Sequence, residues 1–127
     1  MKRLLLQGKK QKGRIMAINS RAKGKRGELE IAKILKSRGY MDARRSVQYC
    51  GANGDADVVG LPGVHLEIKR VERLNLEDAM QQSRTDARED ELPVVVHKKN
   101  HKKWLCTMEF SDFLDLIEKS RRRDNSE

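Results

Sequence analysis

With 127 residues and a formal net charge of +9, the chain has room for one domain with a core of about 100 residues. Charged residues make up 37% of it, and no apolar run approaches the length of a membrane span or of a signal-peptide core, so we expect a soluble cytoplasmic protein with no membrane partner. Cys50 and Cys106 lack C-x-x-C spacing, which argues against a disulfide framework or a zinc site and fits a reducing compartment.

The positive charge is concentrated at the N-terminal end. Residues 1–27 contain ten Lys and Arg and no acidic residue, whereas the rest of the chain holds 18 basic and 19 acidic residues. This asymmetry predicts a flexible basic arm over residues 1–23, a single folded domain over 24–120 and a disordered tail over 121–127.

A basic arm on a nearly neutral domain is typical of nucleic-acid binding, and a solubilising tail is the alternative. Lys23, Lys25 and Arg26 lie next to the domain and are candidate DNA contacts. Residues 1–15 either contribute to binding or form an extension upstream of a translation start at Met16.

The first helix of the domain is predicted over about residues 25–38. Leu29, Ile31, Ala32 and Leu35 give it an apolar stripe, and a glycine follows it as a stop signal. Glu28 is in line with this stripe at its edge. A carboxylate there is either a partner of the helix dipole or a site residue.

A strand is predicted over residues 44–49, followed by a Gly-rich loop over 50–54. Arg44 and Arg45 are candidates for contacting phosphates or for ordering a metal site, and exposed strand charges are the alternative. The loop alone is weak evidence for phosphate binding, because no helix follows it.

The most informative stretch follows this loop. Residues 64–70 alternate between apolar and charged side chains, which predicts a strand with one buried face and a charged row on the other. Glu67 and Lys69 then point the same way, about 7 Å apart along the strand. The Gly-Leu-Pro-Gly turn over 60–63 predicts a hairpin that brings Asp57 beside Glu67.

Two carboxylates that meet beside an amine are unfavourable unless a divalent cation lies between them, and Mg²⁺ or Mn²⁺ prefers such oxygen ligands. The alternative is a solvated strand whose charges pair with one another. Asp55 is the chief rival of Asp57 for the ligand role, and we prefer Asp57 because it directly precedes the apolar Val58 and Val59.

The C-terminal half predicts four more elements. Asn75 caps a helix over about 76–88, strands follow over 93–98 and 103–108, and Ser111 caps a last helix with Phe113, Leu114 and Ile117 facing inward. The resulting order, α-β-β-β-α-β-β-α, predicts an α/β fold with a mixed, mostly antiparallel five-stranded sheet flanked by helices.

The pattern Asp57…Glu67-Ile68-Lys69 resembles the D…(D/E)-x-K motif of the PD-(D/E)XK nuclease superfamily. From about residue 19 to 118 the chain is similar to its Holliday-junction resolvase branch in the small phage-encoded form. The short motif is weakly specific, and the order and spacing of the surrounding elements strengthen the match. The resemblance implies a restriction-endonuclease-like core and a phage or prophage protein in a bacterial host.

The resemblance also implies functional residues. In resolvases of this kind a helix opens with a Glu that joins the metal site and closes in a Gly and an aromatic residue, as Glu28 and Gly39-Tyr40 do here. A Gln ahead of an Ala on the second helix matches Gln82 better than Gln81.

The predicted function is therefore metal-dependent hydrolysis of branched DNA, Holliday junctions in particular. Glu28, Asp57 and Glu67 would hold Mg²⁺ or Mn²⁺, Lys69 would orient or deprotonate the attacking water, and Gln82 would position water or phosphate. Paired cuts in a junction imply a homodimer. The alternatives are another nuclease of the superfamily, acting on ends, nicks or duplex, and a non-catalytic DNA-binding module.

Overall fold

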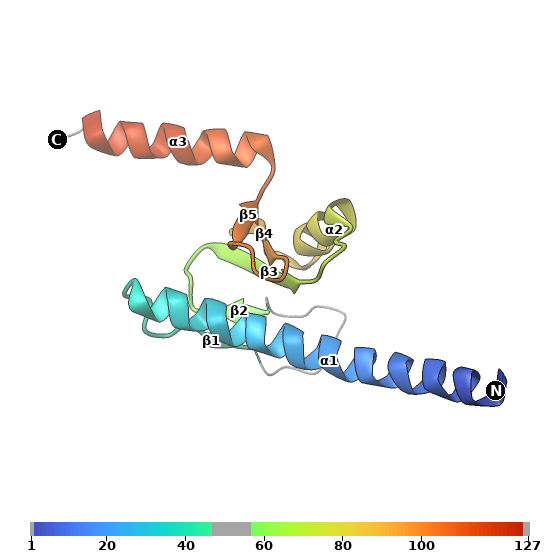
Figure 1. The fold of residues 1–127 in the computed structure, drawn as a ribbon. Coiled ribbons are helices and arrows are strands. Elements are labelled where there is room, and N and C mark those ends of the chain that lie inside the picture. The colour runs from blue at the N-terminus through green and yellow to red at the C-terminus, as the bar shows by residue number, and fades with distance from the viewer. Residues whose placement is uncertain (1, 47–56, 126–127) are drawn as a thin grey trace.

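The structure is a computed structural model that describes residues 2–46 and 57–125, with side chains from residue 20 onward. Three helices and five strands follow one another in the predicted order (Figure 1). Their bounds are α1 Lys2–Ser37, β1 Arg44–Arg45, β2 Val58–Val59, β3 Val64–Arg70, α2 Leu76–Asp86, β4 Leu92–Lys98, β5 Leu105–Thr107 and α3 Phe110–Asn125. No helix in these ranges is both long and apolar enough to cross a membrane.

The five strands form one sheet in sequence order, with β3 at its centre. β3 pairs antiparallel with β2 and parallel with β4, and the other two pairs are antiparallel. The parallel pair needs a crossover connection, which α2 supplies. The predicted mixed, mostly antiparallel sheet is confirmed.

A helix covers each face of the sheet. α1 contacts β1, β2 and β3 on one face, and α2 contacts β3 and β4 on the other (Figure 1). The main core joins Ile31 and Ala32 of α1 to Val58, Leu66 and Ile68 of the sheet. A smaller cluster joins α2 to β4 and is formed by Ala79, Met80 and Val95.

The prediction that β3 buries only one face is therefore wrong. Leu66 and Ile68 pack toward α1 as expected, but His65 and Glu67 are buried as well. Their row lies beneath α2, which the alternation within one strand does not reveal. The charged row is consequently part of the interior rather than a solvated face.

The predicted turn between β2 and β3 depends on a glycine. Gly60 has a φ of +102°, and a Cβ added there would lie 2.5 Å from the backbone of Ala43. Only glycine combines this left-handed backbone with so close an approach. The turn thereby fixes the hairpin that carries Asp57 and Glu67.

α1 begins at Lys2, far ahead of the expected start near residue 25. The preceding stretch contains no proline and many good helix formers, so local propensity favours continuing the helix. Its first turns extend beyond the sheet (Figure 1). The division into arm, domain and tail stays a prediction.

The remaining bounds follow the sequence closely. Asn75 caps α2 by accepting a hydrogen bond from the Asp78 backbone N–H at 3.1 Å, as predicted. β4 begins one residue earlier than expected, and β5 is shorter at both ends. β1 starts at the predicted Arg44, while residues 47–49 of that strand and the Gly-rich loop lie outside the described residues.

The expectation for the last helix is wrong. α3 starts at Phe110 rather than after a Ser111 cap, and it projects away from the sheet (Figure 1). Phe113, Leu114 and Ile117, predicted to face inward, are exposed. No sheet surface lies under them, so the amphipathic pattern of α3 is real but unmatched within the described chain.

Candidate active site

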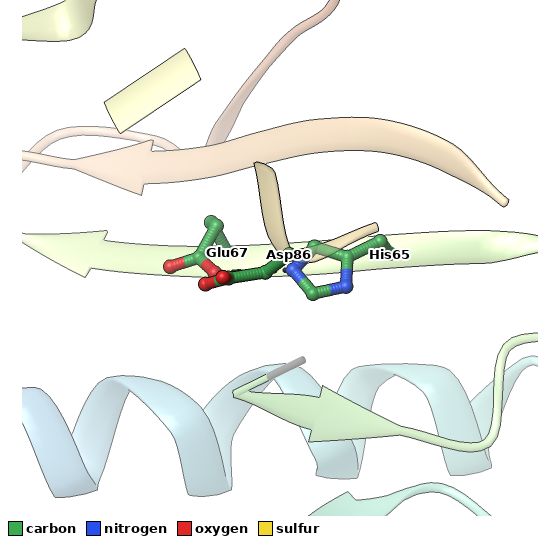
Figure 2. Close-up of side chains that lie close together, drawn as sticks. All are labelled: His65, Glu67 and Asp86. Carbon is green, nitrogen blue, oxygen red and sulfur yellow. Dashed lines mark hydrogen bonds and ion pairs between the residues drawn. The ribbon is translucent and has the colours of Figure 1, made fainter. Parts of the chain in front are cut away.

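The central strand β3 places a row of polar side chains beneath α2. His65 and Glu67 project from β3, and Asp86 reaches them from the last residue of α2 (Figure 2). One ligand atom of each of the three lies within 4.8 Å of the others. Lys69 continues the same row toward the end of the strand.

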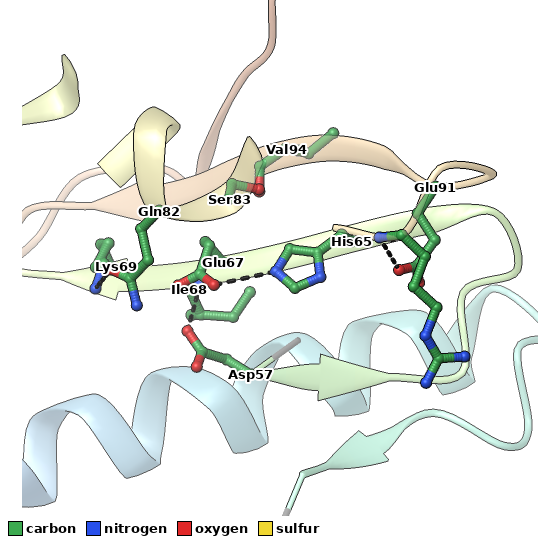
Figure 3. Close-up of polar contacts among 10 residues, drawn as sticks. Asp57, His65, Glu67, Ile68, Lys69, Gln82, Ser83, Glu91 and Val94 are labelled. Atoms are coloured by element: carbon green, nitrogen blue, oxygen red, sulfur yellow. Dashed lines mark hydrogen bonds and ion pairs between the residues drawn. The ribbon is translucent and has the colours of Figure 1, made fainter. Parts of the chain in front are cut away.

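Asp57 is fixed beside this row by two backbone hydrogen bonds. Its own N–H donates to the Leu66 carbonyl at 3.0 Å. Its carboxylate accepts from the Ile68 N–H at 2.9 Å (Figure 3). The register pairs Val58 with Leu66, which brings Asp57 next to Glu67. The predicted meeting of these two carboxylates across the hairpin is confirmed.

This position is electrostatically costly for Asp57. Burial of the carboxyl, together with the nearby charges of Glu67 and Glu28, raises the pKa of Asp57 to about 6. The hydrogen bond from Ile68 and the charge of Lys69 act in the opposite direction. The four predicted ionisable site residues are Glu28, Asp57, Glu67 and Lys69, and they lie close enough to interact. Three of them are acidic and one is basic.

Glu67 is almost completely buried, with only 2% of its surface exposed. Its Oε1 lies 3.1 Å from Nε2 of His65. Its Oε2 is buried and has no hydrogen-bond partner in the described part of the chain. A buried carboxylate oxygen without a partner is strongly disfavoured, and a divalent cation would satisfy it. The donor set of Asp57, Glu67 and Glu28 fits Mg²⁺ or Mn²⁺.

Glu28 is oriented by an ion pair with Arg45, whose guanidinium Nε donates to a carboxylate oxygen. The pair joins α1 to β1 across the hairpin side of the sheet. The role of Arg45, ordering the site or contacting phosphate, stays a prediction. The charge of Glu28 raises the pKa of Asp57, and a role of Glu28 in the site stays a prediction.

Lys69 Nζ donates to Oε1 of Gln82 at 3.3 Å (Figure 3). Gln81, the alternative on the same helix, instead bonds Thr85 and Arg84. The structure thus brings Gln82, and not Gln81, to the lysine of the motif.

The other candidate DNA contacts either bond residues outside this cluster or are exposed. Lys23 pairs with Glu72 at 3.4 Å, and Arg44 donates to the Asp42 carbonyl at 3.5 Å. Lys25 and Arg26 are exposed on α1. Asp55, the rival of Asp57, lies outside the described residues.

Two residues of the cluster, His65 and Asp86, were not predicted to belong to the site. The alternation of β3 already placed His65 on the row of Glu67. Asp86 follows Ser83 by three positions, which puts it on the buried side of α2. The sequence therefore showed which way each side chain points. It did not show that the two side chains meet, because that depends on α2 covering β3.

Most of the chain matches a known protein family. The model described as "Phage putative PDDEXK endonuclease" matches residues 19–126. The chain belongs to this family of PD-(D/E)XK phage endonucleases. No curated protein and no solved structure matches it.

Membership of this family confirms the superfamily recognised from Asp57, Glu67 and Lys69. The five-stranded mixed sheet with its three helices is consistent with a restriction-endonuclease-like fold. Family membership makes the protein a nuclease in type and DNA its substrate class. The roles of individual residues and the form of DNA it cuts are matters for proposal.

Proposed function

We propose that this protein is a Mg²⁺- or Mn²⁺-dependent endonuclease that cuts branched DNA, Holliday junctions in particular, in the cytoplasm of a bacterial host. The observation that carries the proposal is the convergence of Asp57, Glu67 and Lys69 along β3. Glu28 and Gln82 reach the same place from two helices.

In this proposal Asp57, Glu67 and Glu28 hold the metal ion. When bound, the ion supplies charge that polarises the scissile phosphate and lowers the pKa of water. Lys69 offsets the negative charge of the carboxylates and orients the attacking water through its ammonium protons. Gln82 holds the Lys69 ammonium in position, and Arg45 does the same for Glu28.

We further propose that the active form is a homodimer. Two symmetric cuts in a four-way junction need two active sites related by a two-fold axis. The exposed apolar side of α3 supports a self-association surface, because contiguous exposed apolar patches commonly mark interaction sites. An open apolar pocket of about 390 Å³ between α1, the sheet and Leu116 of α3 offers the complementary surface.

The test is cleavage of a labelled four-way junction and of a linear duplex containing one of its arm sequences. With Mg²⁺ or Mn²⁺ we expect symmetric cuts in the junction and much slower cleavage of the duplex, and EDTA should stop both. Full activity in EDTA would contradict the metal mechanism. Equal cleavage of the duplex, or cleavage confined to ends or nicks, would identify another nuclease of the superfamily. Binding without cleavage under every condition would indicate a non-catalytic module.

A further inference from the structure

The cluster of His65, Glu67 and Asp86 is not explained by the proposed catalytic site. That site uses Glu67 together with Asp57 and Glu28. His65 lies on the opposite side of Glu67 from Lys69 and Gln82 (Figure 3), and Asp86 lies near His65 (Figure 2). Glu67 therefore has partners in two directions.

The separation of the donor atoms suits a metal ion. His65 Nε2 and Glu67 Oε1 are 3.1 Å apart. Two ligands of an ion with bonds near 2.1 Å are separated by about 3.0 Å in an octahedral arrangement and by about 3.4 Å in a tetrahedral one. Asp86 completes the group within 4.8 Å. It is half-buried at the last residue of α2, where side-chain rotation can shorten that distance.

Burial is the second observation. Glu67 is 2% exposed, and Asp86 places another carboxylate nearby. His65 is 1% exposed, so water contributes little to balancing these charges. A buried anionic group of this kind is costly unless a cation completes it.

We propose that His65, Glu67 and Asp86 form a second metal site, selective for a divalent transition-metal ion, which shares Glu67 with the catalytic site. The imidazole decides the class of ion. Mg²⁺ prefers oxygen ligands and gives up its water reluctantly, whereas one nitrogen with two carboxylates suits Zn²⁺, Co²⁺ or Mn²⁺. The inference goes beyond the proposed function, because binding of this ion does not depend on cleavage.

The experiment is a titration of the full chain with Co²⁺ in a large excess of Mg²⁺, followed by calorimetry and by the visible absorption of Co²⁺. Cys50→Ser and Cys106→Ser are introduced first to remove thiol ligands. We expect one Co²⁺ per chain. His65→Gln should weaken its affinity by on the order of tenfold or more, because glutamine retains a hydrogen bond to Glu67 but is a poor ligand for such ions.

His97→Gln is the matched control, because His97 is also partly buried in the sheet but bonds Thr107 instead of this cluster. Its affinity for Co²⁺ should equal that of the parent. Asp86→Asn is the second test variant and should also weaken binding, even if His65→Gln fails to fold. Asp57→Asn should still bind Co²⁺ although it cannot cleave, which separates this site from the catalytic one.

Absence of Co²⁺ binding over Mg²⁺ would overturn the proposal. Binding that stays unchanged in both His65→Gln and Asp86→Asn would also overturn it. In either case the His65–Glu67 contact would be a hydrogen bond that only orients the catalytic carboxylate.

Discussion

At the scale of single residues, the site depends on two carboxylates forced together. Asp57→Asn and Glu67→Gln each remove one proposed metal ligand while keeping size and hydrogen-bonding capacity. We expect junction cleavage to fall by at least roughly a hundredfold, the upper end of the loss seen when even an outer partner of a metal is removed. DNA binding should survive or tighten, because a negative charge facing phosphate is lost.

Single-turnover cleavage and a gel-shift titration measure the two effects separately. Glu118→Gln, an exposed position on α3, is the control and should behave as wild type. Normal cleavage by Asp57→Asn together with inactivity of Asp55→Asn would transfer the ligand role to Asp55.

The raised pKa of Asp57 also predicts how stability depends on pH. The folded protein holds this proton up to about pH 6, whereas the unfolded chain releases it near the ordinary value of 3.8. Stability from the protonated form is therefore present at low pH and lost as pH rises through about 6. At neutral pH the ionised Asp57 therefore lowers the free energy of unfolding of the metal-free protein by about 2 to 3 kcal/mol.

Asp57→Asn removes that charge, so at about pH 7.5 without metal its melting temperature should exceed that of wild type. The difference should shrink toward zero at about pH 4, and Mg²⁺ should stabilise wild type more than the variant. Thermal unfolding in EDTA and in Mg²⁺ measures both comparisons. A variant that melts no higher than wild type at neutral pH would show that Asp57 is not under electrostatic strain.

Much of this residue-level arrangement could be predicted, because the residues involved are close together in the sequence. A Gly-containing turn and strict alternation fix which side chains of a hairpin meet, so Asp57, Glu67 and Lys69 followed from the sequence. The contact of Arg45 with Glu28 and the proximity of Asp86 to His65 join segments distant in the chain. Alternation within one strand carries no information about such contacts, and only the packing of α1 and α2 supplies it.

At the scale of elements, the order of helices and strands was predicted because each has its own periodicity and turn signals. The environment of an element was harder to predict. The same amphipathic pattern that puts Ala79 and Met80 of α2 in the core leaves Phe113 and Leu114 of α3 exposed. A pattern shows that a helix has an apolar side but does not show which surface covers it.

If a second copy covers α3, disrupting its apolar side should produce monomers. Phe113→Glu places a charge among Phe110, Leu114 and Ile117, whereas Lys119→Glu makes a change on the opposite side of the same helix. We expect light scattering to give a dimer for wild type and Lys119→Glu and a monomer for Phe113→Glu. The monomer's own stability should change by no more than about 0.5 kcal/mol, since Phe113 is 44% exposed.

A wild-type protein that is monomeric at all concentrations would contradict this interface. A strong loss of stability in Phe113→Glu would instead indicate that α3 closes over the apolar pocket of its own chain.

At the scale of the whole molecule, most of the excess positive charge lies in a different part of the chain from the carboxylate site. The carboxylate site lies at the centre of the sheet, where negative charge accumulates, whereas ten basic residues and no acidic ones occupy residues 1–27. DNA must approach the carboxylates against repulsion, so positive charge elsewhere has to supply the attraction. α1 connects the two regions, because the helix that carries Glu28 begins at Lys2.

Deleting residues 1–15 tests how much of that attraction the N-terminal end supplies. The deletion removes six of the ten basic residues: Lys2, Arg3, Lys9, Lys10, Lys12 and Arg14. Each phosphate contact contributes roughly −0.9 to the slope of log affinity against log salt. We expect the smaller effect, with binding and slope nearly unchanged and metal-dependent cleavage intact, because Arg21, Lys23, Lys25 and Arg26 remain beside Glu28. A salt titration of both proteins on a four-way junction decides it. Weaker binding with a flatter slope, by about one unit per lost contact, would show instead that residues 1–15 lie on DNA.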